Sequence, residues 1–160
     1  MGQQVMYQYY EAALNRNRGV INLKEDTIKL ALVASTYTPD LDAHTIWEDV
    51  SSYEVATGDG YTTGGETLTG VTLTRSGALV TFDAADITWS SLTKTFRYGV
   101  LYIVGTKTDP EGGPDIVNPL YAYILWDDTP ADITVSGTDW VAQWSTSGIS
   151  VFGPKADICT

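Results

Sequence analysis

Hydrophobic positions are densest in two stretches of the chain, residues 93–104 (TKTFRYGVLYIV) and residues 119–126 (PLYAYILW). Side chains of a β-strand alternate between its two faces, so a strand with one solvent-facing side shows a polar residue at every second position. From Gly99 onward the first stretch is apolar on both faces, and so is the second. Both are rich in the β-branched and aromatic residues that strands favour. We therefore predict two paired central strands, with Arg97 marking where the first emerges from the core.

These two strands supply the expected hydrophobic core. Its predicted members are Tyr98, Leu101, Tyr102 and Ile103 on the first strand and Tyr121, Tyr123 and Ile124 on the second. The connection between the strands, residues 105–118, is polar and contains several Gly and Pro residues. Such a composition indicates an exposed loop.

The N-terminal residues 3–15 place apolar side chains at spacings of three and four, which is the period of an α-helix. The stripe consists of Met6, Tyr9, Tyr10, Ala13 and Leu14. This spacing predicts an N-terminal helix that ends near Gly19, because glycine commonly terminates helices.

A helix of about a dozen residues is marginal in water by itself, so packing has to hold this one in place. Its stripe covers either the protein's own sheet or a neighbouring subunit. Tyrosine rings supply a large apolar area together with a hydroxyl group, a combination favoured at interfaces. In the second case Tyr7, Tyr9 and Tyr10 are the candidate interface residues.

A second, short helix is predicted over residues 43–50, with Asp42 as its N-cap. Its apolar residues Ile46, Trp47 and Val50 are expected to pack against the sheet. The other elements are short strands bounded by turn residues. We expect them at residues 26–33, 71–75, 78–82, 86–89, 133–135, 139–144 and 149–152, with a tight turn at Ser76 and Gly77.

This succession predicts a mainly β fold, a single antiparallel β-sandwich-like domain with an N-terminal helix and one short helix. The domain spans residues 1–160, of which residues 1–19 form the helical segment and residues 20–160 the sheet. A chain of 160 residues is long enough to bury one sizeable core without a disulfide or a metal.

The charge of the chain is strongly acidic, with 20 Asp and Glu against 9 Lys and Arg and a net charge of −11. Such a field repels phosphate backbones and anionic lipids, so we expect neither a nucleic-acid nor a membrane partner. No apolar run of ~18 residues occurs that would span a bilayer. The single cysteine, Cys159, predicts a free thiol near the chain end. The N-terminus lacks the basic and apolar regions of a signal peptide, which predicts synthesis in the cytoplasm.

Three potential metal ligands, Asp40, Asp42 and His44, alternate along the chain and would share one side of an extended segment. Against a metal site, Asp42 is expected to cap a helix and Asp40 follows a proline in a turn. The acidic residues Asp109, Glu111 and Asp115 are oxygen ligands of the kind calcium prefers, but their spacing is not that of an EF-hand. We interpret them as a solvated loop tip.

Catalytic motifs give no stronger signal. The glycine-rich residues 57–70 lack the GK[ST] ending of a phosphate-binding loop, and no GxSxG, HExxH or CxxC motif occurs. The one histidine has no cysteine partner for nucleophilic chemistry. We therefore predict a non-enzymatic protein with no catalytic residues, no metal and no cofactor.

Four blocks carry a family resemblance through their order: NLKEDTIKLALVASTYTPDLDAHTIWEDVSSYEV, GDGYTTGGETLTGVTLT, VTFDAADITWSSLTKTFRYGVLYIV and NPLYAYILWDD. Together they resemble small virion structural proteins of tailed bacteriophages, of the head decoration or cement type, over roughly residues 7–148. The resemblance implies a β-sandwich-like domain that binds the outside of an assembled shell, commonly as a symmetric oligomer. It thus implies the major capsid protein and further copies of the chain as partners, and the phage head surface as location. The loop 105–118 and the tail 150–160 depart from the pattern.

Two other functions remain open. Similar β domains are reused throughout virions and fold does not fix location, so a tail, neck or baseplate component is the first alternative. The five tryptophans suggest a carbohydrate-binding or receptor-binding module as the second. Most of these tryptophans lie in apolar alternation, which favours core positions.

Overall fold

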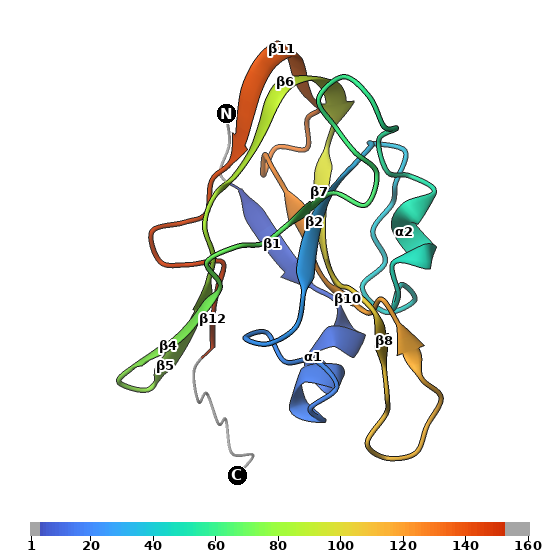
Figure 1. The fold of residues 1–160 in the computed structure, drawn as a ribbon, viewed down its shortest axis with the longest axis vertical. Coiled ribbons are helices and arrows are strands. Elements are labelled where there is room, and N and C mark those ends of the chain that lie inside the picture. The colour runs from blue at the N-terminus through green and yellow to red at the C-terminus, as the bar shows by residue number, and fades with distance from the viewer. Residues whose placement is uncertain (1–3, 153–160) are drawn as a thin grey trace.

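A five-stranded antiparallel sheet forms the centre of the computed structural model, which describes residues 4–152 (Figure 1). Its strands lie in the order β1-β10-β7-β2-β3. The bounds are β1 Val5–Gln8, β2 Ile28–Val33, β3 Glu66–Thr67, β7 Tyr98–Ile103 and β10 Leu120–Leu125. The prediction of a mainly β, antiparallel, sandwich-like fold is confirmed.

Strand β7 has a hydrogen-bonded neighbour on each side, β10 and β2. The predicted pairing of the two apolar stretches is therefore confirmed, and β2 supplies the second neighbour through an unbroken register from Ile28 opposite Ile103 to Val33 opposite Tyr98. A strand paired on both edges and covered on both faces keeps few polar side chains, because they would lack water.

The predicted strand 93–104 is in fact two strands, which is a correction. β6 (Ile87–Phe96) ends before Arg97 and β7 begins after it. The backbone N–H of Arg97 donates to the carbonyl of Val33 at 3.0 Å. At this point the chain leaves the pairing of β6 with β11 (Ile133–Ala142) and enters the five-stranded sheet.

The other strands form smaller antiparallel units around this sheet (Figure 1). β12 (Ser150–Phe152), β5 (Leu79–Asp83) and β4 (Thr72–Ser76) make a three-stranded sheet, and β8 (Thr106–Lys107) pairs with β9 (Ile116–Val117). The β4–β5 hairpin is confirmed, but Ser76 pairs with Leu79, so its two-residue turn is Gly77 and Ala78. Gly77 has a φ of 59°, which suits the first central position of a type II′ turn.

The N-terminal helix is confirmed, but its predicted start is wrong, which is the main error of the sequence prediction. Residues 5–8 form strand β1, paired with β10 so that Tyr7 lies opposite Tyr123, and helix α1 covers only Tyr10–Asn17. The pairing continues to the end of the strand, where the Tyr9 N–H donates to the Tyr121 carbonyl at 3.2 Å. Residues 5–8 thus form their backbone hydrogen bonds with the edge of β10 and not within a helix.

The second helix, α2 (Glu48–Ser51), is shorter than predicted, and Asp42 does not cap it. The carboxylate of Asp49 instead accepts the backbone N–H groups of Thr45 and Ile46, at 2.8 and 3.1 Å. Val50 is buried as expected, and Trp47 stacks on Tyr102 with ring centroids 4.4 Å apart.

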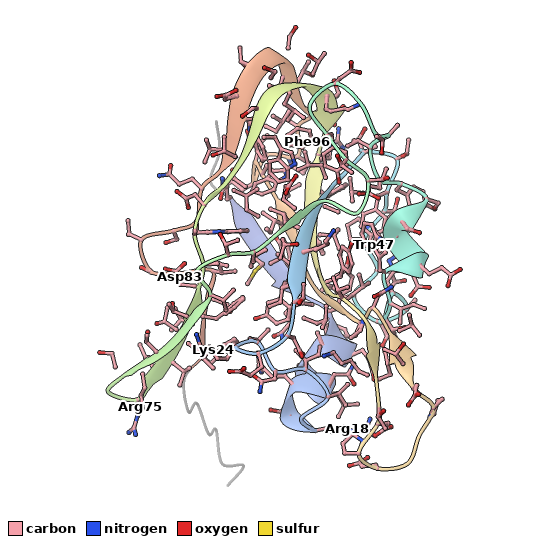
Figure 2. All side chains as sticks on the ribbon, viewed as in Figure 1. Arg18, Lys24, Trp47, Arg75, Asp83 and Phe96 are labelled. Carbon is pink, nitrogen blue, oxygen red and sulfur yellow. The ribbon has the colours of Figure 1, made fainter. Side chains whose placement is uncertain are left out.

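Most of the predicted core is confirmed. Leu101, Ile103 and Tyr121 have no exposed surface, and Tyr102 and Ile124 are also buried. Tyr98 and Tyr123 are only half-buried, and their rings meet edge to face. Phe96 of β6 (Figure 2) is fully buried. Its ring packs against that of Trp140 on β11, with 4.8 Å between the ring centroids.

Candidate interaction surface

The three tyrosines predicted as interface residues lie in different surroundings. Tyr9 has no exposed surface, and its hydroxyl oxygen lies 2.8 Å from that of Tyr37. Tyr7 is 40% exposed and stacks on Tyr123 at 5.0 Å, while Tyr10 is 63% exposed. The prediction is therefore wrong for Tyr9, which belongs to this chain's own core. For Tyr7 and Tyr10 it stays a prediction.

Tyr9 begins a buried hydrogen-bonded chain that continues through Tyr37 to His44. The Tyr37 hydroxyl lies 2.9 Å from His44 Nδ1. Burial, reinforced by the hydrogen bond to Tyr37, raises the pKa of Tyr9 far above its ordinary value, and burial raises the pKa of Tyr37 to about 12. Both hydroxyls stay protonated at neutral pH, so they serve as structural hydrogen-bonding groups.

The group Asp40, Asp42 and His44 forms a turn. Asp40 Oδ1 accepts the backbone N–H groups of Ala43 and Asp42, each at 3.0 Å, and these bonds lower the pKa of Asp40. His44 Nδ1 is also within 3.2 Å of the Asp40 backbone nitrogen. Across residues 4–152, no cluster of three His, Cys, Asp or Glu side chains has the geometry to hold a metal ion.

Asp109 of the acidic loop after β8 is held by Arg18 at the end of α1, which corrects its interpretation as part of a solvated tip, whereas residues 110–115 are exposed as predicted. Both carboxylate oxygens of Asp109 accept from Arg18 Nη2, at 2.5 and 2.6 Å, and the Glu111 carboxylate lies 2.9 Å from the same nitrogen. Asp109 is only 9% exposed. The Glu111 backbone N–H and then the Arg18 guanidinium lower the pKa of Asp109. Asp115 alone remains on the surface without an ion pair among the described residues.

We expect Asp109→Asn to lower the melting temperature at pH 7, because it removes the charged partner of Arg18. A carboxyl whose pKa is lowered by folding stabilises the fold above its unfolded pKa of about 3.9, and this contribution is lost as the pH falls through the folded pKa. The difference between wild type and variant should therefore narrow below about pH 4. Asp115→Asn is the matched control in the same loop and should melt like the wild type. An Asp109→Asn variant with unchanged melting at pH 7 would contradict the assignment.

All five tryptophans pack in or against the hydrophobic core. Trp89 and Trp126 are 2% and 4% exposed, Trp140 lies between them at 5.5 and 5.0 Å, and Trp47 covers Tyr102. Trp144 also borders a hollow, and its indole N–H donates to the Ala85 carbonyl at 3.0 Å. The predicted core role of most tryptophans thus agrees with their burial.

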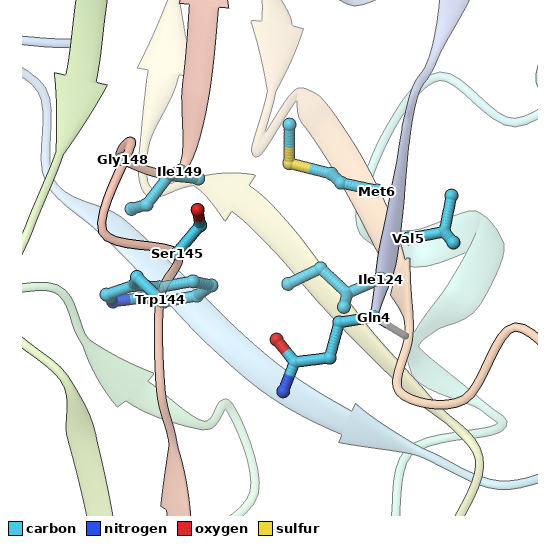
Figure 3. Close-up of a pocket in the computed structure, with 8 residues that line it drawn as sticks. All are labelled: Gln4, Val5, Met6, Ile124, Trp144, Ser145, Gly148 and Ile149. Atoms are coloured by element: carbon cyan, nitrogen blue, oxygen red, sulfur yellow. The ribbon is translucent and has the colours of Figure 1, made fainter. Parts of the chain in front are cut away.

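The hollow beside Trp144 has a volume of about 160 Å³ and lies between β1 and the segment before β12 (Figure 3). It is lined by Gln4, Val5, Met6, Ile124, Trp144, Ser145, Gly148 and Ile149. These residues supply apolar contacts, an amide and a hydroxyl, but no acid, base or thiol. Among the described residues that line the hollow, the Ser145 hydroxyl has no neighbouring base to activate it as a nucleophile.

The most exposed apolar side chains near the N-terminus lie on one face of α1. Tyr10 and Leu14 are 63% and 46% exposed, and residues four apart in a helix are neighbours on its surface. No helix within residues 4–152 is long and apolar enough to cross a membrane. Comparison with protein-family models, with curated proteins and with solved structures found no match.

Proposed function

We propose that the protein is a non-enzymatic structural protein of a tailed-phage virion that decorates the outside of the capsid shell, with the major capsid protein as its partner. The resemblance of four sequence blocks, in order, to decoration proteins supports this function. The single structural observation that carries it is the exposed apolar face of α1, formed by Tyr10 and Leu14, with the partly exposed Tyr7 on the preceding strand β1. Exposed apolar anchors on a rigid sheet are what a binding protein needs.

The surroundings of the ionisable groups fit a non-catalytic role. Burial raises the pKa of Glu54, while its Oε1 accepts the Tyr61 hydroxyl and the Gly64 N–H, both at 2.6 Å. These bonds fasten the glycine-rich loop onto the sheet. The buried tyrosines with raised pKa values also bond to neighbours within the fold. Perturbed groups mark catalytic sites when they line a cleft, whereas here they serve the packing of the chain.

The test is binding to purified shells of the phage that carries the protein, measured by co-sedimentation. We expect the wild type to bind in hundreds of copies per particle, and a Tyr7→Ser, Tyr10→Ser, Leu14→Ser variant to lose most of this binding while keeping its circular dichroism spectrum. Val141→Ser is the control, since Val141 is 44% exposed on β11, outside the N-terminal segment.

Two results would overturn this proposal. One is shell binding by the triple variant equal to that of the wild type, which would remove the observation that carries it. The other is a protein found in virions at tens of copies or fewer, which would favour the neck or baseplate. Binding to isolated tails in place of shells would favour a tail component.

A further inference from the structure

The β4–β5 hairpin projects from the body of the protein (Figure 1), and only its base, at Phe82, is fully buried. All residues from 72 to 79 are exposed. Leu73 is 42% exposed and Leu79 is 49% exposed, and the pairing register places them on opposite faces of the hairpin. A short hairpin with apolar side chains open on both faces gains stability when another surface covers it.

The hairpin carries one cation, Arg75, at its tip (Figure 2). Its Nε donates to the Gly77 carbonyl at 2.9 Å, and it forms no ion pair with any residue between 4 and 152. Four other cationic side chains form ion pairs within the same molecule. Arg18, Lys94, Arg97 and Lys107 each pair with a carboxylate of their own protomer.

An acidic groove lies on another part of the same molecule, where α1, α2 and β9 meet. It has a volume of about 320 Å³ and is lined by the carboxylates of Glu11, Glu48 and Asp115 and by the apolar side chains Ile46, Ile116 and Val117. Val117 is 49% exposed. Among the described residues, none of these three carboxylates has an ion-pair partner.

The hairpin and the acidic groove complement each other in charge and polarity. One is a projecting element with a cation and two exposed leucines, and the other is a hollow with three carboxylates and three apolar side chains. They lie on opposite sides of the protein, with β4 and β5 on one side and α2 and β8 on the other, so one molecule cannot join its own pair (Figure 1). β4 also has a free edge, since it is the outer strand of its sheet.

We propose that the β4–β5 hairpin of one copy docks into the acidic groove of a second copy, with Arg75 placed against Glu48, Glu11 and Asp115. Such a contact joins two different surfaces, so it is heterologous and builds either a closed ring or an open chain of copies. This self-association does not depend on the virion role. A protein that binds shells as a monomer would refute it and leave the proposed function intact.

Charge reversal with rescue tests this contact by sedimentation velocity. We expect the wild type to sediment as associated copies at high concentration and physiological salt, where the repulsion between copies of net charge −11 is screened. Arg75→Glu and Glu48→Lys should each weaken association by at least about tenfold, because like charges then face each other. The double variant should associate more strongly than either single variant but below the wild type, since the reversed charges at positions 75 and 48 attract each other while Glu11 and Asp115 still repel the new carboxylate at position 75.

Matched controls carry the same charge changes elsewhere on the surface. Lys24→Glu lies on an exposed turn outside the hairpin, and Glu66→Lys lies on the edge strand β3. Both should associate like the wild type. A wild type that stays monomeric at high concentration, single reversals that associate normally, or a double variant as weak as the single ones would each overturn the proposal.

Discussion

Replacing Ile103 with Ala is expected to lower the free energy of unfolding by about 2–5 kcal/mol. Ile103 has no exposed surface and ends the central strand β7, opposite Ile28 of β2. Truncation removes buried methyl groups and leaves a cavity that neighbours paired on both sides cannot readily fill. Chemical denaturation followed by circular dichroism measures the loss.

Val104→Ala is the control for this substitution. Val104 is the next residue and is 38% exposed, and its backbone N–H donates to the Thr27 carbonyl at 2.8 Å in either variant. Surface substitutions of this kind usually stay within about 0.5 kcal/mol. An Ile103→Ala loss below about 1 kcal/mol would mean that the strand is not packed as described.

The central strands were predictable because their amino-acid composition alone indicates burial. β7 and β10 are apolar on both faces, and no solvent-facing strand would have that pattern. The hairpin at Gly77 was predictable for a similar reason, since glycine suits its positive φ. Arg97 was predicted to mark where the strand emerges from the core, but the break in the strand there was not predictable, because the residues on both sides of it favour strands equally. What separates β6 from β7 is the change of pairing partner, which is a tertiary feature.

The N-terminal segment misled the prediction because short apolar runs fit both periods. The spacing of Met6, Tyr9 and Tyr10 suits a helix, yet Val5 and Tyr7 also alternate as a strand does. The free edge of β10 decided between them, and a local pattern contains no information about that edge. The chain then changes structure at Tyr9, which closes the strand pairing and precedes α1.

For the candidate surface, the sequence indicated which residue types are exposed but not which residues lie together. Acidic residues in a glycine-rich loop indicate exposure on average, but Asp109 meets Arg18, which lies 91 positions away in the sequence. The hairpin and the acidic groove are likewise assembled from separate segments. Contacts between distant residues depend on how the sheets are connected, so charge patterns along the chain do not reveal them.

The second large effect is expected at Tyr9, where Tyr9→Ala should cost about 3–5 kcal/mol, as for other buried aromatic residues. Tyr9→Phe keeps the ring and removes only the hydroxyl bonded to Tyr37, so it should cost about 0.5–1.5 kcal/mol. Tyr10→Ala is the neighbouring control and should change stability by less than about 0.5 kcal/mol. Urea denaturation measures the unfolding free energies of the three variants, and the loss should be largest for Tyr9→Ala and smallest for Tyr10→Ala.

Because Tyr9 is a core residue, binding experiments on the N-terminal segment should use substitutions of exposed residues and not a deletion. Deleting residues 1–15 would remove β1 together with Tyr9, Ala12 and Asn15, all fully buried, so the deletion should unfold the sheet and abolish binding for a trivial reason. Surface substitutions at Tyr7 and Tyr10 leave the core intact and isolate the contact with a partner. If Tyr9→Ala were as stable as Tyr10→Ala, Tyr9 would not be a core residue, and the first fifteen residues would again be available as a separate binding arm.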